Sequence, residues 1–536
     1  IVYNWTNNTP SIGLAASGSG NIVSFNAINA TNAPVTATIT VIASYTNGGT
    51  TCTSAPITFT ITVNPTPVVN AVPNQVVCNG ELTTDVVFSS PATGGTIVYN
   101  WTNNNTSIGL AASGTGNILA FTATNITNAP VTATISVIAS YTNGGVTCTG
   151  PTRTFTITVN PTPVVNQVAS QTVCNGAPTA AVTFSSPTTG GTIVYSWTND
   201  NTSIGLGASG TGNIASFNAI NTSNAPVTAN ISVTASYTNG GTTCTSMPMV
   251  FTITVNPTPT VDPVANQVVC NGAPTVAVTF TGTVTGTVYN WTNNTPSIGL
   301  AASGSGNIAS FNAVNAGTTP VTATITVTPT YTNGGTTCTG TPRTFTITVN
   351  PTPTVNAVAN QVVCNGAPTT AVTFSGAVAG TVYNWTNNTP SIGLAASGTG
   401  NIASFNAVNT TNAPVVATIT VTPSYTNGGT TCTGASRTFT ITVNPTPTVN
   451  PVANQTVCNG AATPAINFNG TVAGTVYSWT NNTPSIGLAA SGTGNIASFT
   501  AINTGTTPVT ATITVTPSYT NGSTTCTGTP ITFPIT

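Results

Sequence analysis

Ionisable side chains are almost absent from this sequence. The 536 residues include three Lys and Arg together, four Asp and Glu together and no histidine, so the formal net charge at pH 7 is −1. General acid–base catalysis needs a histidine or a tuned carboxylate beside its partner, and a nucleophilic Ser or Cys needs a base to take its proton. No part of the chain supplies such a pair, so we expect no catalytic residues and no enzyme.

The same scarcity of charge excludes several classes of ligand. Calcium sites need several carboxylates for each ion, and zinc sites need clustered Cys and His, so we expect no metal and no other cofactor. Three arginines, Arg153, Arg343 and Arg437, cannot form the basic surface that nucleic acids require. No apolar run reaches the length of a membrane helix, and no signal-peptide pattern opens the sequence. We therefore expect any export signal or anchor to lie outside these residues.

Internal repetition organises the chain. The motif Y-[NS]-W-T-N recurs with a spacing of 96 residues and later 94, and its tryptophans are Trp5, Trp101, Trp197, Trp291, Trp385 and Trp479. The segment N-P-T-P recurs in step at 64–67, 160–163, 256–259, 350–353 and 444–447. Two prolines favour an extended, stiff linker, so these segments mark the predicted boundaries. The predicted repeats are 1–64, 65–160, 161–256, 257–350, 351–444 and 445–536.

The first repeat is incomplete. It begins just before its Trp5 and lacks roughly 30 residues that every other repeat has. One interpretation is that the sequence is a window on a longer array. The other is that a strand donated by another subunit completes this repeat.

Period-two alternation predicts β-strands throughout each repeat. Residues 35–41 read V-T-A-T-I-T-V and residues 58–63 read T-F-T-I-T-V, with apolar side chains on one face and threonine on the other. Turn signals follow at intervals of about 8 to 12 residues, which is typical of sandwiches. We expect an all-β protein, a linear tandem array of immunoglobulin-like sandwiches of about seven strands each. The tryptophans should be core residues, although an exposed aromatic platform for sugar rings fits the pattern too.

Cysteines follow the same period, one in V-C-N-G and one in T-C-T-[GS]. Pairing within each repeat gives Cys78 with Cys148, Cys174 with Cys244, Cys270 with Cys338, Cys364 with Cys432, and Cys458 with Cys526. This leaves Cys52 over, its partner belonging to the missing part of the first repeat. Pairing across the linker, starting with Cys52 to Cys78, also fits the spacing but leaves Cys526 unpaired. We favour pairing within repeats because domains usually fold on their own. Either scheme implies an oxidising compartment.

The segment S-I-G-L-A-A-S-G-[ST]-G-N is rich in glycine and recurs in every repeat with small changes. A phosphate-binding loop would need the sequence G-K-[ST] and a following helix, and neither is present. We expect a turn-rich loop of the sandwich instead.

The motifs together resemble a known family. N-P-T-P, V-A-N-Q-x-V-C-N-G, Y-N-W-T-N-N and T-C-T-G-x-x-x-T-F-T-I-T-V-N-P are similar to the PKD-like, immunoglobulin-like repeats of very large Bacteroidota surface proteins. That family includes adhesins exported by the type IX secretion system, among them SprB-type gliding adhesins. The resemblance covers the whole chain and implies display as long extracellular filaments on the bacterial cell surface. These residues include no C-terminal sorting domain, so the resemblance does not extend to the mode of attachment.

These observations lead to one expected function and two alternatives. The expected function is the structural stalk of a surface adhesin, which extends a distal binding region and bears force during adhesion or gliding motility. Its partners would be adjacent repeats and, through a region outside these residues, a surface polysaccharide or substratum. Alternatively, the repeats themselves bind polysaccharide with avidity, or they self-associate laterally into a fibre or sheath.

Overall fold

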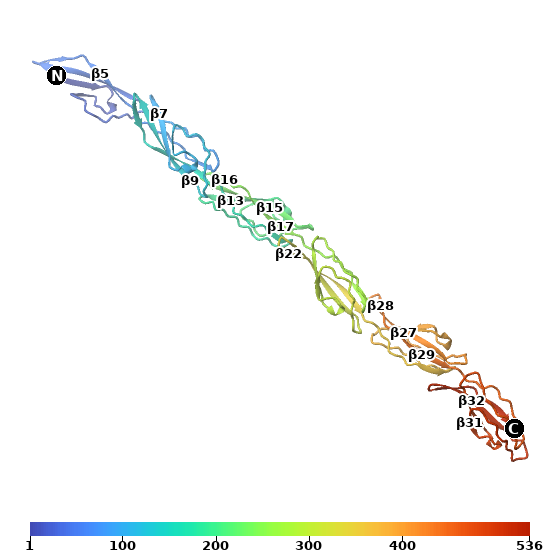
Figure 1. The fold of residues 1–536 in the computed structure, drawn as a ribbon. Helices are drawn as coiled ribbons and strands as arrows, with labels where there is room; N and C mark the ends of the chain where they lie inside the picture. The colour runs from blue at the N-terminus through green and yellow to red at the C-terminus, as the bar shows by residue number, and fades with distance from the viewer. The chain divides into compact units, whose positions relative to one another are not determined.

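The protein is all-β, and the computed structural model describes all of residues 1–536. Each sequence repeat forms one sheet, and Figure 1 follows these sheets along the chain from blue to red. By contacts the chain divides into two compact units, residues 1–258 with 331–338, and residues 259–330 with 339–536. The predicted repeat boundaries are a finer division than this one and stay a prediction.

The second repeat illustrates the main sheet. Its six strands are β6 (Gln75–Cys78), β7 (Thr96–Asn103), β8 (Ser113–Thr115), β9 (Val131–Asn143), β10 (Val146–Thr149) and β11 (Arg153–Asn160). They are ordered β6-β11-β9-β7-β8, and β10 pairs with β9. The first strand runs parallel to the last, while the other pairs are antiparallel. The first and last strands of the repeat in sequence are therefore neighbours in the sheet.

The other repeats have equivalent strands. Those equivalent to β7 and β8 are β1 (Val2–Asn7) and β2 (Ser17–Ser19), β13 (Thr192–Asn199) and β14 (Ser209–Thr211), β19 (Val288–Asn293) and β20 (Ser303–Ser305), β25 (Val382–Asn387) and β26 (Ser397–Thr399), and β30 (Val476–Asn481) and β31 (Ser491–Thr493). Between the two strands of each pair lies a single 3₁₀ turn: η1 (Pro10–Ile12), η2 (Thr106–Ile108), η3 (Thr202–Ile204), η4 (Pro296–Ile298), η5 (Pro390–Ile392) and η6 (Pro484–Ile486).

A long strand and its hairpin partner follow in every repeat. The strands equivalent to β9 and β10 are β3 (Val35–Asn47) and β4 (Thr50–Thr53), β15 (Val227–Asn239) and β16 (Thr242–Thr245), β21 (Val321–Asn333) and β22 (Thr336–Thr339), β27 (Val415–Asn427) and β28 (Thr430–Thr433), and β32 (Ala511–Asn521) and β33 (Thr524–Thr527). The last strands, equivalent to β11, are β5 (Ile57–Val63), β17 (Met249–Asn256), β23 (Arg343–Asn350), β29 (Arg437–Asn444) and β34 (Ile531–Ile535).

The strand equivalent to β6 is the most variable. It is present as β12 (Gln171–Cys174), β18 (Gln267–Cys270) and β24 (Gln361–Cys364). In the sixth repeat it is reduced to one parallel bridge between Gln455 and Ile535, and the first repeat has no equivalent. The first and last sheets therefore have five strands and the four between them have six.

The core lies between this sheet and a less regular second layer. In the second repeat that layer consists of two segments joined by the isolated bridges Leu82–Thr122 and Val86–Ile118. Polar side chains complete its backbone bonding, because Phe88 N–H donates to Asn117 Oδ1 at 3.0 Å. The sequence predicts about seven strands in each repeat; the structure has six in the main sheet of this repeat, and isolated bridges alone join the segments of the second layer.

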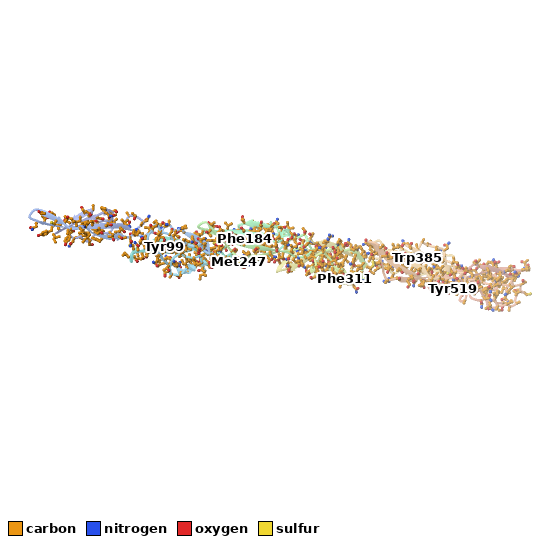
Figure 2. All side chains as sticks on the ribbon, turned by 90° about the horizontal axis from the view of Figure 1, so that it is seen from above. Tyr99, Phe184, Met247, Phe311, Trp385 and Tyr519 are labelled. Atoms are coloured by element: carbon orange, nitrogen blue, oxygen red, sulfur yellow. A yellow bond between two sulfur atoms is a disulfide. The ribbon has the colours of Figure 1, made fainter.

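The alternation predicted from sequence holds in the complete repeats. Along β9 every second residue from Ala133 to Tyr141 is buried, and along β11 the same is true from Phe155. Mostly threonine and serine alternate with them, apart from Ile138, and Thr132 and Thr158 hydrogen-bond across the outer face at 2.9 Å. Aromatic side chains are found in every repeat, and Figure 2 labels Tyr99, Phe184, Phe311, Trp385 and Tyr519 in repeats two to six. Such packing confirms the all-β, immunoglobulin-like class expected from the sequence.

Candidate functional site at the repeat junctions

The six repeated tryptophans are core residues, as predicted. Their exposed fractions lie between 7% and 9%. The backbone of the glycine at the centre of S-G-[ST] packs directly on each indole. A Cβ at Gly114 would stand 2.2 Å from the ring of Trp101, so no larger residue fits there without a shift. The indole nitrogens are buried without an acceptor. The alternative of an exposed platform for sugars is therefore wrong for these residues, and the glycine-rich segment serves tryptophan packing.

The structure instead draws attention to the ends of the repeats, where asparagines pair. Asn160 ends β11, and Asn239 ends β15 of the following repeat. Asn239 Nδ2 donates to Asn160 Oδ1 at 2.9 Å, and Asn160 Nδ2 donates to the Asn239 carbonyl oxygen at 3.1 Å. Asn160 is fully buried, so both bonds are shielded from water. The equivalent pairs are Asn64 with Asn143, Asn256 with Asn333, Asn350 with Asn427, and Asn444 with Asn521.

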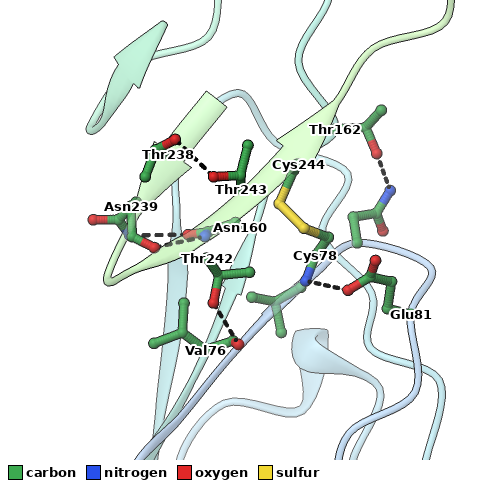
Figure 3. Close-up of a disulfide and its surroundings, with 12 residues drawn as sticks. Val76, Cys78, Glu81, Asn160, Thr162, Thr238, Asn239, Thr242, Thr243 and Cys244 are labelled. Atoms are coloured by element: carbon green, nitrogen blue, oxygen red, sulfur yellow. Dashed lines mark hydrogen bonds between the residues drawn. A yellow bond between two sulfur atoms is a disulfide. The ribbon is translucent and has the colours of Figure 1, made fainter. Parts of the chain in front are cut away.

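A tight hairpin brings each of these contacts within reach. The turn of β15 and β16 contains Gly240 and Gly241 at φ +58° and +79°, a conformation that glycine adopts without strain. The turn also approaches β6 closely, since a Cβ at Gly240 would stand 2.9 Å from a methyl carbon of Val76. The Thr242 hydroxyl then donates to the Val76 carbonyl oxygen at 3.0 Å. The hairpin of one repeat is thus held on the first strand of the repeat before it (Figure 3).

A disulfide closes the same junction. Cys78, at the end of β6, bonds to Cys244 in β16 with a Cα–Cα distance of 5.6 Å (Figure 3). Three more bonds repeat this connection: Cys174 with Cys338, Cys270 with Cys432, and Cys364 with Cys526. Each joins the first cysteine of one repeat to the second cysteine of the next. The junction therefore combines an asparagine pair, a threonine hydrogen bond and a covalent bond.

This connectivity corrects the pairing predicted from sequence. The structure contains none of the bonds Cys78 with Cys148, Cys174 with Cys244, Cys270 with Cys338, Cys364 with Cys432, or Cys458 with Cys526. It also lacks the alternative bond across the linker between Cys52 and Cys78. Cys52, Cys148 and Cys458 are free thiols in this structure.

Strand direction explains why pairing within a repeat fails. Cys78 lies opposite Asn160, at the end of β11, because β6 and β11 are parallel. Cys148 lies opposite Tyr141, near the end of β9, and β9 runs antiparallel to β11. The two cysteines therefore occupy opposite ends of one repeat, separated by about 33 Å of strand at roughly 3.3 Å per residue. A disulfide needs Cα atoms within about 7 Å.

Sequence reasoning missed the asparagine pairs altogether. A signal was present, because the Asn before P-T-P and the Asn of Y-T-N-G recur in every junction. Asparagine is common in turns, however, so its recurrence beside proline and glycine was compatible with a local role. The sequence does not show that the hairpin of one repeat contacts the preceding repeat, and this contact is what gives the asparagines a role between repeats instead of a local role in turns.

Electrostatics at these sites is weak. Burial raises the pKa of the tyrosine that lies two residues before the tryptophan in each complete repeat: Tyr99, Tyr195, Tyr289, Tyr383 and Tyr477. Hydrogen bonds from the side chain and backbone of Asn230 lower the pKa of the exposed Asp200. The three arginines are exposed at the start of their strands.

The surface outside the junctions does not gather ionisable side chains into a cluster. A hollow of about 360 Å³ at the end of the sixth repeat is lined by Val457, Ile486 and Ile535 among others, and none of its side chains is ionisable. No three His, Cys, Asp or Glu side chains gather where they could hold a metal ion. None of the short helical turns has the length or apolar character needed to cross a membrane. Covalent linkage between repeats is thus the chemistry that the arrangement supplies.

Comparisons with known proteins add little beyond architecture. No family model and no curated protein matches the sequence. Among solved structures, the protocadherin GammaB4 extracellular domain aligns with 94% of this chain and 88% of its own, at 13% identity and a TM-score of 0.28. Sidekick-1 immunoglobulin domains 1–5 align with 88% of this chain and 98% of their own, at 11% identity and a TM-score of 0.22. The first eight Ig domains of the Down Syndrome Cell Adhesion Molecule cover 99% of this chain and 79% of their own, at 10% identity and a TM-score of 0.23. With scores this low, no function is carried over from these proteins.

Proposed function

We propose that this chain is a non-catalytic structural array, the stalk of an extracellular adhesin that holds a binding region away from a cell surface. The observation that carries the proposal is the recurrence of one junction. Asn160 with Asn239, Thr242 with Val76, and Cys78 with Cys244 have equivalents at three further junctions. A stalk requires equivalent, stable contacts between each repeat and the next, whereas a binding module requires a site whose side chains recognise a ligand.

Cellular location follows from the disulfides. Four structural disulfides in one chain are typical of proteins in an oxidising compartment, because cytosolic thiol systems keep cysteines reduced. We therefore place the array outside the cell. Its assignment to a bacterial surface, to gliding motility and to export by type IX secretion rests on the sequence resemblance alone.

A repeat deletion tests the stalk. Removing residues 257–444 joins Asn256 to Pro445, which restores the N-P-T-P linker, and it leaves Cys174 in register to bond with Cys526. Cells that display the shortened chain should attach through the distal region as well as cells with the full chain. Attachment that falls in proportion to the number of repeats, with the distal region still displayed, would mean that the repeats themselves bind.

Two further measurements separate the alternatives. Binding of the whole chain to a glycan array would support polysaccharide recognition by the repeats, although their tryptophans are buried. Sedimentation that depends on concentration would support lateral self-association through the threonine-rich faces. A stalk predicts neither.

A further inference from the structure

The loops that the four disulfides close overlap along the chain. The loops closed by the four bonds span residues 78–244, 174–338, 270–432 and 364–526. Each loop opens before the previous one closes: Cys174 precedes Cys244, Cys270 precedes Cys338, and Cys364 precedes Cys432. Every peptide bond between Cys78 and Cys526 therefore lies inside at least one closed loop.

We propose that the staggered disulfides make the array covalently redundant, so that no single backbone cleavage between Cys78 and Cys526 divides the chain. When a protease cuts inside a loop, the disulfide of that loop still joins the two parts. Pairing within repeats would not do this, because the linkers at 160–163, 256–259, 350–353 and 444–447 would lie outside every loop. With the observed connectivity each of these linkers is enclosed.

Redundancy is useful for an exposed extracellular chain. Loop tips are preferred sites of proteolytic cleavage, and this chain has long exposed loops in every repeat. In the second repeat Ile126 lies at such a tip and is fully exposed, at 101% of its reference area. A cut there removes no repeat from the array. The proposal depends only on connectivity, so it holds even if the array is not an adhesin stalk.

The chain provides a matched control for testing this. Ile126 lies inside the loop 78–244, whereas the equivalent residue of the first repeat, Ala30, lies outside every loop. Both belong to exposed tips with nearly the same sequence, N-I-T-N-A and N-A-T-N-A. A recognition site for a specific protease is inserted after Ile126 in one variant and after Ala30 in the other. Each full-length chain is then cleaved to completion and denatured.

Gel electrophoresis gives the result. The chain cut after Ile126 should run as one species without reductant and as two fragments with reductant. The chain cut after Ala30 should run as two fragments in both conditions. Release of fragments from the Ile126 variant without reductant would overturn the proposal. In the same variant, the paired change Cys78→Ser with Cys244→Ser should abolish the linkage, since no other loop encloses residue 126.

The disulfide connectivity can also be measured directly, on a chain without an inserted protease site. Peptide mapping of the unmodified chain without reductant should recover the Cys78 peptide bonded to the Cys244 peptide. Recovery of Cys78 bonded to Cys148 would also overturn redundancy, because the linkers would then lie outside the loops. Free thiols at these positions would have the same meaning.

Discussion

The first and second repeats share five strands of the main sheet but have different cores. Phe59 and Phe155 occupy the same position in the last strand, yet Phe59 is 46% exposed and Phe155 only 2%. In the second repeat Phe88, from the irregular layer, packs on Phe155 with ring centroids 6.2 Å apart. Residues before the tryptophan motif therefore supply the cover for this part of the core, and the sheet alone forms only half of it.

The tryptophans, unlike the phenylalanines of the last strand, are buried by residues close to them in sequence. Trp5 of the first repeat is 8% exposed and Trp101 of the second 7%, so both are buried although only the second repeat has both segments of the irregular layer. The indole is covered by its own neighbouring strand, through Gly18 or Gly114. The core of a repeat thus has one local part, formed by adjacent strands, and one part that depends on residues distant in sequence.

The largest expected effect tests the distant part. Phe155→Ala should lower the local free energy of unfolding of the second repeat by about 3–5 kcal/mol, because it empties a buried site. Phe59→Ala should cost much less, since half of this side chain already faces water. Hydrogen exchange resolved by peptide, over residues 131–160 and 35–63 of the whole chain, measures both. Equal losses of protection would contradict this account of the core.

An intermediate effect tests the local part. Gly114→Ala forces a Cβ into the indole of Trp101 and should cost about 1–3 kcal/mol. Gly18→Ala makes the same clash with Trp5, so here the two repeats should lose equal protection. Gly207→Ala is the control, because its Cβ would approach nothing closer than 3.9 Å. If Gly18→Ala were silent, the tryptophan site would depend on the irregular layer after all.

A smaller effect is expected at the junctions. Asn239→Ala removes the donor to the side-chain oxygen of the fully buried Asn160, which keeps only its bond to the backbone carbonyl of residue 239, and should cost about 1 kcal/mol, seen as faster exchange at the hairpin of β15 and β16. Asn143→Ala should cost less, because its partner Asn64 is only half-buried. The reverse order would indicate that the disulfide, and not the asparagine pair, holds the second junction.

The smallest effect is the response to pH. The raised tyrosine pKa values mean that the unfolded chain ionises first, so this contribution to stability is complete below about pH 10 and is lost as the pH rises further. The lowered pKa of Asp200 gives a contribution that is complete above its ordinary value of 3.8 and is lost as the pH falls below that value. Thermal midpoints should therefore be nearly constant from pH 4 to 9 and fall above pH 10. A shift of more than about 10 °C between pH 4 and 9 would reveal a bound ion.

Much of this fold could be predicted from sequence because its causes are local. Alternation in V-T-A-T-I-T-V identifies the inner face of a strand, and the one tryptophan that recurs in each repeat was predicted to lie in the core. The irregular layer was harder to foresee, since side chains such as Asn117 replace the regular backbone bonds that a strand pattern implies.

The disulfide pairing could not be derived from spacing because the sequence is periodic. Cys78 lies 70 residues from Cys148 and 166 from Cys244, and the two separations differ by one period of 96 residues. Because the second cysteine recurs once in every repeat, the spacing fits a partner in the same repeat as well as it fits a partner in the next one. Only the direction of β6, parallel to β11, decides which cysteine is within reach.

The parallel pairing of β6 with β11 also sets the order in which the protein can assemble. During synthesis Gln75 must wait for Ile157 before its strand has a partner, and Cys78 must wait for Cys244 in the following repeat. Contacts so distant in sequence form slowly, because the intervening chain has to be ordered first. Cys78 therefore stays a free thiol until the hairpin of the following repeat has folded against β6, and a repeat can complete its oxidation only after its successor is in place.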